Sequence, residues 1–274
     1  MTSLLATFKD STALITGASS GIGQGYAKHF ASLGINLILT ARTEQKLIVL
    51  ADELTQKYNV NITVISLDLS KTHAAQTLFE EIQNRNLSVN ILINNAGFGK
   101  WTKFLDQSIE TYNEMITLNI INLTMLCHLF LPKMVSNQKG IIINISSTGA
   151  FQPLPYIAVY GATKSYVLHF TEALAGEYRS SGIKCLAVCP GNTDTNFTQV
   201  ANADTHGMSS SSVEEVVLAT ITALDKNKST MIVGYRNYLT AQLPRVLSRE
   251  QVIKLVGGML RTRLSNNPNI SETT

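Results

Sequence analysis

Cysteine is scarce in this chain of 274 residues, and none of it is arranged to bind a metal. The three cysteines, Cys127, Cys185 and Cys189, lack the paired spacing of a zinc or iron–sulfur site. Cys185 and Cys189 stand four apart in an apolar run, where their side chains share one face of a strand. We therefore expect buried, reduced thiols, no metal site and a cytoplasmic location.

Charge and long apolar runs are also scarce. Charged residues make up 15% of the chain, and 22 Lys and Arg against 19 Asp and Glu give a net charge of +3. This small charge, with no basic stripe, excludes the basic surface of a nucleic-acid-binding protein. No apolar run reaches the ~18 residues of a membrane-spanning helix, and the first ten residues do not resemble a signal peptide. The sequence therefore predicts neither a transmembrane span nor a signal peptide.

Short apolar runs alternate along the chain with longer amphipathic segments. The apolar runs cover residues 12–16, 35–40, 62–67, 89–95, 140–146, 183–189 and 229–234. Helical patterns follow them, including residues 73–85 and 108–135 and the stretches after Gly21, around Tyr160 and after Ser212. This alternation predicts an α/β fold with a single doubly wound, parallel, seven-stranded sheet, Rossmann-like, and helices on both faces. No linker or repeat divides the chain, so we expect one domain over residues 1–274.

A glycine-rich turn follows the first apolar run. Gly17, Gly21 and Gly23 end a predicted strand and open a predicted helix, where backbone N–H groups can hold phosphate. Ser19 and Ser20 add two hydroxyl groups. The spacing differs from the common Gly-x-Gly-x-x-Gly, so the turn alone is compatible with either a nucleotide site or an ordinary tight turn.

Tyr160 and Lys164 stand four residues apart in a predicted helix, one turn apart on the same face. A free phenol has a pKa of about 10, and acid–base catalysis favours a value near 7, a difference of ~4 kcal/mol. One cation at ~4 Å in a medium of effective dielectric ~20 contributes ~4 kcal/mol. The pair therefore predicts a proton-transfer site, with a solvated surface pair as the alternative.

Taken in order, these landmarks resemble the short-chain dehydrogenase/reductase family over about residues 8–235. They are TGASSGIG at 16–23, NNAG at 94–97, Asn119, Ser147, Tyr160, Lys164 and Pro190-Gly191. The resemblance implies that Ser147 hydrogen-bonds the substrate oxygen, while Tyr160 donates or removes its proton. It also implies that Lys164 lowers the phenol pKa and binds the nicotinamide ribose, and that Asn119 holds a water linking Lys164 to solvent.

The same resemblance implies a nicotinamide dinucleotide. The residues expected to bind it are Gly17, Ser19, Ser20, Gly21, Ile22, Gly23, Arg42, Asp68, Asn95, Ala96, Gly97, Tyr160, Lys164, Pro190, Gly191, Thr193 and Thr195. Two positions depart from the usual family pattern. Thr193 stands where an aliphatic residue is common, and Gly25 stands where Ala is more usual, at a helix-propensity cost of up to ~1 kcal/mol.

Arg42 indicates which dinucleotide is bound. In this architecture a carboxylate after the second strand holds a ribose 2′-hydroxyl, whereas a basic residue accepts a 2′-phosphate. Arg42 occupies that place, so we predict NADP(H) rather than NAD(H). The alternative is that Arg42 is solvated and Glu44 turns back to the ribose, although Thr43 as N-cap and Glu44 in the first helical turn explain that pair equally well. Asp68 is either an adenine contact or an ordinary turn residue.

The substrate end of the sequence is apolar. Residues 196–211 form a polar segment that we expect to be a mobile substrate lid. The aromatic and aliphatic residues expected in the cleft are Phe98, Trp101, Phe151, Leu154, Tyr156, Phe197 and Met208. They indicate an apolar ketone or aldehyde of lipid, steroid or acyl type, unless most of them only pack the lid.

Residues 240–264 are expected to form a C-terminal helical extension. A helix begins after Ser248, which forms a capping box with Gln251. Basic residues alternate there with apolar ones: Arg245, Arg249, Lys254, Arg261 and Arg263. The extension is expected to touch a membrane surface peripherally, to contact a partner subunit, or simply to close the apolar end of the cleft.

These observations predict an NADP(H)-dependent oxidoreductase that interconverts a carbonyl and an alcohol by hydride transfer. Two alternatives stay open: an NAD-dependent alcohol dehydrogenase of the same family, and a non-catalytic dinucleotide-binding sensor or scaffold. The resemblance also implies a homodimer or homotetramer built on the long helices around Asn119 and Tyr160.

Overall fold

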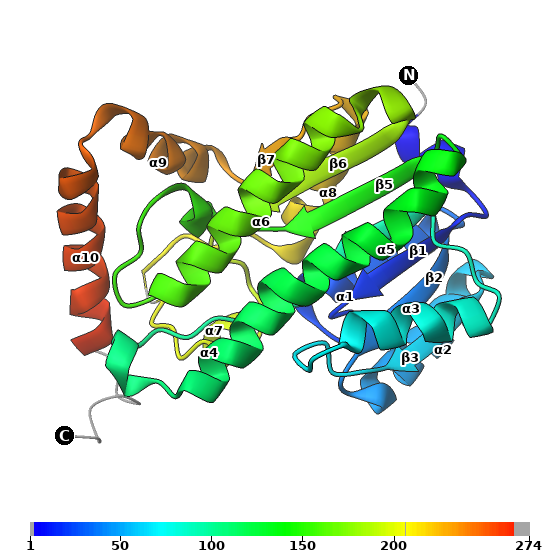
Figure 1. Cartoon of the computed structure of the whole chain (residues 1–274), viewed down its shortest axis with the longest axis horizontal. Coiled ribbons are helices and arrows are strands. Elements are labelled where there is room, and N and C mark those ends of the chain that lie inside the picture. Colours follow the sequence, from blue (N-terminus) through cyan, green and yellow to red (C-terminus); the bar gives the residue numbers. More distant parts are fainter. Residues whose placement is uncertain (1–2, 206, 266–274) are drawn as a thin grey trace.

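A computed structural model describes residues 3–205 and 207–265, which form one seven-stranded sheet between two layers of helices (Figure 1). The strands are β1 Thr12–Thr16, β2 Asn36–Ala41, β3 Ile62–Ser66, β4 Ile91–Asn94, β5 Gly140–Ile145, β6 Ile183–Cys189 and β7 Thr230–Ile232. Their order is β3-β2-β1-β4-β5-β6-β7, and every neighbouring pair is parallel. The predicted fold class is confirmed.

The helices follow the strands in the predicted alternation. They are α1 Gly21–Ser32, α2 Glu44–Tyr58, α3 Ala74–Asn84, α4 Ile109–Ile116, α5 Leu123–Ser136, α6 Ala158–Glu177, α7 Phe197–Val200, α8 Val213–Asp225, α9 Tyr235–Val246 and α10 Arg249–Ser265. A π-helical segment, Thr117–Asn122, joins α4 to α5 without a break. Four short 3₁₀ turns lie at Leu4–Phe8, Phe104–Asp106, Thr148–Phe151 and Arg179–Ser181.

The C-terminal extension starts earlier than predicted. Helix α9 begins at Tyr235, directly after Gly234, whose φ of +87° ends β7 with a sharp turn. Helix α10 begins after Ser248, and the predicted capping box is present: Ser248 N donates to Gln251 Oε1 at 2.9 Å and Gln251 N donates to Ser248 Oγ at 3.3 Å. Both helices lie at one end of the molecule, beyond the sheet (Figure 1).

The sheet buries apolar side chains on both faces, which is why its strands read as continuous apolar runs. In β1, Ala13 and Ile15 point to the layer made by α1, α2 and α8, while Leu14 points to the layer made by α3, α5 and α6. All three side chains are fully buried. Figure 1 shows α5 and α6 crossing one face of the sheet.

The order of the strands reverses direction between β1 and β4. In a parallel sheet of this kind the loops at the carboxyl ends of the strands separate at that point and leave room for a ligand. The glycine-rich turn follows β1, residues 95–97 follow β4, and Ser147 follows β5. The fold therefore brings the predicted cofactor and catalytic residues to one edge.

One described helix is long and apolar enough to cross a membrane by length and composition. It runs from Ile109 to Ser136, with a mean hydropathy of 1.6 in its most apolar window, of which 44% is buried. Leu126, Phe130 and Met134 of this helix pack into the core against the sheet. A core helix passes the same test, so the finding alone does not indicate a span.

Gly25 has a packing partner that the sequence did not reveal. A methyl group at Gly25 in α1 would overlap Val213 Cγ1 at the start of α8. Glycine therefore lets α1 and α8 approach each other closely, at the expense of helix propensity.

We predict that Gly25→Ala destabilises the protein by about 1–2 kcal/mol, because the overlap outweighs the ~1 kcal/mol gain in helix propensity. Urea unfolding measures the change, and adding Val213→Ala should remove most of the penalty. Gly176→Ala in α6 is the matched control: no atom lies within 4 Å of its Cβ position, so it should stabilise. Equal effects at Gly25 and Gly176 would contradict this packing argument.

Candidate active site

A cavity of about 920 Å³ runs along the carboxyl edge of the sheet, from Arg42 to α9 and α10. Nearly all of the predicted site residues line its wall: Gly17, Ser19, Ser20, Gly21, Ile22, Arg42, Asp68, Asn95, Ala96, Gly97, Ser147, Tyr160, Lys164, Pro190, Gly191, Thr193 and Thr195. Gly23 and Asn119 are not on the wall, and both lie behind it. One continuous space therefore joins the predicted cofactor residues to the predicted catalytic ones.

The glycine-rich turn is held tightly against the loop after β4. Gly17 and Gly21 have φ values of +65° and +54°, a conformation that L side chains rarely adopt. A methyl group at Gly17 would lie 2.9 Å from Ala96 Cα, and one at Gly23 would overlap the carbonyl oxygen of Gly17. Gly23 thus closes the turn from behind, while Gly17 and Gly21 shape the surface toward the cavity.

The start of α1 leaves backbone donors available. Ser20 occupies the N-cap position with extended backbone, and its side chain makes no capping hydrogen bond. The first N–H groups of a helix have no intrahelical acceptor, so an uncapped start that lines a cavity suits an anionic phosphate. The turn therefore fits the pyrophosphate of a dinucleotide.

Thr16, which begins the glycine-rich motif but was not among the predicted site residues, ties the two loops together. Its hydroxyl oxygen accepts from Asn95 N at 3.0 Å and from Ala96 N at 2.9 Å, and Asn95 Nδ2 donates to Thr16 O at 2.9 Å. These bonds fix residues 95–97 beside the glycine-rich turn. The signal for Thr16 was its place as the last residue of the strand and the first of the motif at 16–23.

Arg42 follows β2 directly and is exposed at the end of the cavity. Glu44 begins α2 and is not on the cavity wall, and Thr43, at the N-cap position, makes no capping bond. Asp68 lies near Arg42 and accepts hydrogen bonds from Ser70 N at 3.0 Å and Ser70 Oγ at 2.8 Å. Burial alone would raise the pKa of Asp68, but these hydrogen bonds, with Arg42 and Lys71 nearby, hold it below its ordinary value. Asp68 is thus both a turn residue and part of the wall.

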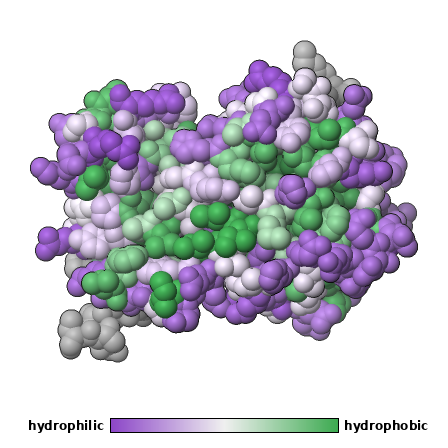
Figure 2. All heavy atoms as spheres, in the orientation of Figure 1, coloured by the Kyte–Doolittle hydropathy of each residue, from purple (hydrophilic) through white to green (hydrophobic). Residues whose placement is uncertain are grey.

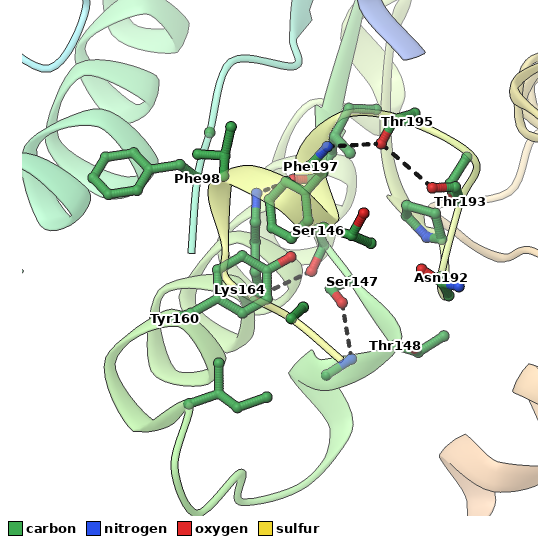
Figure 3. A pocket seen from close by; sticks show the side chains of 18 of the residues that line it. Phe98, Ser146, Ser147, Thr148, Tyr160, Lys164, Asn192, Thr193, Thr195 and Phe197 are labelled. Carbon is green, nitrogen blue, oxygen red and sulfur yellow. Dashed lines mark hydrogen bonds between the residues drawn. The ribbon is translucent and has the colours of Figure 1, made fainter. Parts of the chain in front are cut away.

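The predicted reacting groups lie together at the centre of the cavity (Figure 3). Ser147 Oγ accepts from Gly149 N at 3.0 Å in the 3₁₀ turn after β5. The ring of Tyr160 lies 5.6 Å from that of Phe197, centroid to centroid. On its other side the backbone comes so close that a methyl group at Gly99 would lie 2.7 Å from Tyr160 Cδ2. Gly99 is a second residue that the sequence interpretation left out, although it follows NNAG by two positions.

Lys164 is almost fully buried, and its ammonium group lies beside the Tyr160 ring. Its Nζ donates to Ile145 O at 2.8 Å and lies 5.8 Å from the Tyr160 ring centroid. A methyl group at Gly97 would lie 3.2 Å from Lys164 Nζ and 3.1 Å from Asn119 Oδ1. Glycine thus leaves these two polar groups room at this point of the wall, where a methyl group would press on both.

Asn119 lies in the π-helical segment, a local widening that often occurs at functional sites. Its Nδ2 donates to Phe98 O and to Thr163 Oγ1, both at 3.0 Å, and its Oδ1 accepts from Phe98 N at 3.3 Å. Asn119 therefore fixes the loop after β4 against α6. A carboxamide oxygen has two lone pairs, so one acceptor position is left over.

The sequence predicted that Lys164 lowers the pKa of the Tyr160 phenol toward 7, and the pKa values in the protein without cofactor differ from this prediction. Tyr160 keeps partial exposure toward the cavity, but protein encloses its hydroxyl, and burial raises its pKa to about 12, with the Ser147 hydroxyl opposing the rise. Burial lowers the pKa of Lys164 to about 8. Burial is the largest cause of both shifts, and the protein groups by themselves do not bring the pKa of the phenol near 7.

The substrate end is formed differently from the sequence prediction. Of the seven apolar residues expected there, Phe151 and Tyr156 do not line the cavity, because Phe151 packs into a small cluster with Leu168 and Tyr156 takes φ +68° in a turn facing elsewhere. Helices α9 and α10 supply much of the wall instead. Their lining residues are Arg236, Asn237, Thr240, Ala241, Leu243, Pro244, Val252, Leu255, Val256, Met259 and Leu260.

The segment after β6 connects the two ends of the cavity. Thr195 packs on Gly21, where an added methyl group would lie 2.9 Å from Thr195 Cγ2, and Thr193 bridges to Ser211. The predicted lid, of which residue 206 lies outside the described residues, is tied back to the loop after β4 at Val200 and Ala201. Trp101 N donates to Ala201 O at 2.9 Å and Lys100 Nζ donates to Val200 O at 2.6 Å. Opening of this segment would have to break these bonds.

Comparison with known proteins gives a consistent family. The family model described as short chain dehydrogenase matches residues 11–206. The chain is 36% identical over 181 residues to "Hydroxysteroid dehydrogenase-like protein 1" of Gallus gallus, which covers 65% of this chain and 54% of the relative. It is 35% identical over 192 residues to "Inactive hydroxysteroid dehydrogenase-like protein 1" of Homo sapiens, with 69% and 58% covered. The chain thus spans little more than half the length of these curated relatives.

A solved structure extends the comparison to nearly the whole chain. The short-chain dehydrogenase from Sphingobium yanoikuyae in complex with NADPH is 32% identical, with a TM-score of 0.77, and the match covers 93% of this chain and 96% of that one.

The buried Lys164 should lower the stability of the protein at neutral pH. Its pKa of about 8 in the folded protein lies below the ordinary 10.5, so the unfolded chain binds more protons between these values. The loss of unfolding free energy caused by the buried ammonium group is largest below about pH 8. It becomes smaller as the pH rises and is absent above about pH 10.5.

We therefore predict that Lys164→Met raises the free energy of unfolding at pH 7 by about 1–3 kcal/mol, after allowance for the hydrogen bond to Ile145 O that the substitution removes. This gain should disappear near pH 10.5. Chemical denaturation at the two pH values measures it. Lys139→Met is the control, since Lys139 also donates to a backbone carbonyl but is exposed. A loss of stability at pH 7 in Lys164→Met would refute the claim.

Proposed function

Because this chain belongs to the short-chain dehydrogenase/reductase family, we propose that it is an NADP(H)-dependent oxidoreductase that interconverts a carbonyl and an alcohol. One observation carries the proposal. The Tyr160 phenol, the Ser147 hydroxyl and the Lys164 ammonium line the same cavity as an uncapped helix start shaped by glycine. A pocket built only for packing or for a scaffold has no need of two buried ionisable groups at its centre.

The cofactor, when bound, supplies the hydride that reduces the carbonyl carbon. Tyr160 donates its phenolic proton to the carbonyl oxygen, and its high pKa keeps that proton in place at neutral pH. Ser147 Oγ already accepts from Gly149 N, so its own hydroxyl hydrogen is available to the same substrate oxygen. Lys164 uses one N–H on Ile145 O and has others for the nicotinamide ribose. The protonated phenol favours the reductive direction.

The cofactor preference rests on Arg42. Its guanidinium group stands at the end of β2, where it can accept a 2′-phosphate, while Glu44 lies off the cavity wall. The reversed case, an NAD-dependent alcohol dehydrogenase, needs a carboxylate at this place, and Ala41, Arg42 and Thr43 provide none.

The proposed substrate is an apolar ketone or aldehyde of lipid, steroid or acyl type. Leu154, Ile157 and Phe197 line the cavity near Tyr160, and Val252 and Leu260 of α10 extend the apolar wall. Such a pocket gains binding energy from apolar surface and uses the few polar groups at Tyr160 for orientation. The names of the chicken and human relatives, which refer to hydroxysteroids, agree with this class.

A second candidate function is a dinucleotide-binding sensor or scaffold without turnover. The human relative is named an inactive hydroxysteroid dehydrogenase-like protein, so a protein similar to this chain is described as inactive. In the present chain Tyr160, Lys164, Ser147 and Asn119 are all present. The cavity also extends well past Tyr160, and this space is of no use to a protein that binds only the dinucleotide.

The proposed homo-oligomer would form on the long helix from α4 to α5. Figure 2 shows a hydrophobic patch in the middle of the face that this helix crosses, and the exposed apolar residues of the helix include Ile109, Ile116 and Ile121. Tyr166 of α6 borders it, with its hydroxyl 2.9 Å from Thr124 Oγ1. Burial of such a patch is the usual reason for subunit association.

We expect Ile121→Asp to reduce the molecular mass measured by light scattering to that of a monomer, because it places a charge in the buried interface. The control is Ile48→Asp on α2, whose exposure is similar, and it should leave the mass unchanged. A wild-type protein that is already monomeric would rule the interface out.

The function itself is tested by titrating the protein with NADPH and with NADH, followed by NADPH oxidation in the presence of apolar ketones. NADPH should bind about 10- to 100-fold more tightly, and Arg42→Ala should remove that preference, because one charge-assisted bond is lost. Tyr160→Phe should keep NADPH binding and lose turnover.

Three results would decide against parts of this proposal. Equal affinity for the two nucleotides would remove the role of Arg42, and retained turnover in Tyr160→Phe would remove the role of the phenol. Tight nucleotide binding with no oxidation of NADPH by any carbonyl class would favour the sensor or scaffold.

A further inference from the structure

Helix α9 carries apolar side chains on the side that faces solvent. Tyr235, Tyr238, Leu239 and Val246 are exposed to 75%, 50%, 49% and 78%. Their spacing of three, four and eleven residues from Tyr235 places them on one side of the helix, which we call the outer stripe.

The opposite side of α9 faces the cavity, so the helix is turned the reverse way from an ordinary surface helix. Asn237, Thr240 and Ala241 line the cavity, and Asn237 packs against the Pro190–Gly191 turn, where a methyl group at Gly191 would lie 2.5 Å from its Nδ2. These contacts fix the rotation of α9 and leave the outer stripe outside. An exposed apolar stripe of this kind marks an interaction surface.

The same pair of helices holds an unusual share of the positive charge. Between residues 235 and 265 there are six Lys and Arg and one Asp or Glu, a charge of +5 in a chain whose total is +3. Arg245, Arg249, Lys254 and Arg261 are exposed, and none of them forms an ion pair within the described part of the chain. Figure 2 shows hydrophobic atoms set among hydrophilic ones at the end of the molecule formed by α9 and α10.

The mouth of the cavity opens on these helices. Leu255 and Met259 of α10 stand one turn apart, both line the cavity, and both are more than half exposed. A surface that covers α9 and α10 would therefore lie next to the entrance through which an apolar ligand passes.

We propose that the outer stripe and the basic residues of α9 and α10 dock on an anionic lipid bilayer. Aromatic and aliphatic side chains flanked by Arg and Lys are the composition of a helix that lies in the interface of a membrane without crossing it. A second copy of this chain fits less well, because an isologous contact would set one basic surface against another. The docking does not depend on the reaction, but it would place the cavity mouth beside the lipid.

The test is co-sedimentation of the purified full chain with vesicles of phosphatidylcholine containing about one third phosphatidylserine, and with vesicles of phosphatidylcholine alone. At low salt the protein should bind the anionic vesicles at least about tenfold more strongly than the neutral ones. High salt should abolish most of that difference through screening. Binding that is absent, or equal on both vesicles, would overturn the proposal.

Two pairs of variants locate the surface. Leu239→Ser with Val246→Ser removes part of the outer stripe, and Leu105→Ser with Val49→Ser is the matched control, since Leu105 and Val49 are equally apolar and exposed elsewhere.

Lys254→Glu with Arg261→Glu reverses two charges on α10, and Lys226→Glu with Lys228→Glu makes the same change of net charge after α8. Each pair of substitutions on α9 or α10 should weaken vesicle binding about tenfold, while each control pair should leave vesicle binding unchanged.

Equal loss in the tail and control pairs would show attraction by net charge and apolar surface in general, and would overturn the assignment to α9 and α10. Light scattering of the same proteins tests the alternative, that a second copy of this chain binds the outer stripe. If the Leu239→Ser and Val246→Ser pair separates subunits and the wild type binds no vesicles, the outer stripe is a contact between copies of this chain and the membrane proposal is wrong.

Discussion

The structure depends on placing two ionisable side chains, Tyr160 and Lys164, at the centre of the cavity with most of their surface covered by protein. Burial raises the pKa of the phenol to about 12 and lowers that of the ammonium to about 8. The fold thus carries an unfavourable desolvation energy at its centre, where β5 ends and α6 crosses the sheet. Strain and desolvation of this kind persist only where the surrounding structure holds the groups in place, and they concentrate at reacting centres. The proposed chemistry follows from the same constraint, since a protonated phenol is a proton donor.

The neighbouring elements are shaped around this pair. The π-helical segment turns Asn119 toward Phe98 and Thr163, which fixes the loop after β4 against α6. Gly97 and Gly99 let that loop pass close to Lys164 Nζ and the Tyr160 ring, where a methyl group would be crowded at Gly97 and would overlap the ring at Gly99. At the far end, α9 and α10 line the cavity and leave their own outer surface apolar and basic. The residues predicted to bind the cofactor, the predicted reacting groups and the wall formed by α9 and α10 thus line one cavity along the sheet edge.

Much of this could be predicted from the sequence, because the evidence was local. Strand and helix periods gave the sheet and its layers, and the spacing of Tyr160 and Lys164 placed both on one face of a helix. What could not be predicted depends on neighbours distant in sequence. The sign of the pKa shift at Tyr160 depends on burial, the need for Gly25 depends on Val213, and the wall formed by α9 depends on Asn237 meeting Gly191. Helix α9 was also hard to recognise because it carries Pro244 and has its apolar residues on the outside.

The most direct test of this account is the ionisation of Tyr160 in the protein without added nucleotide. NMR of tyrosines labelled at Cζ, with the Tyr160 signal assigned from Tyr160→Phe, reports the state of the phenol as the pH is raised. The account predicts that this signal shows no ionisation up to about pH 10, because burial raises the pKa of the phenol to about 12. A midpoint near pH 7 would contradict it, and would mean that Lys164 alone is enough to activate the phenol.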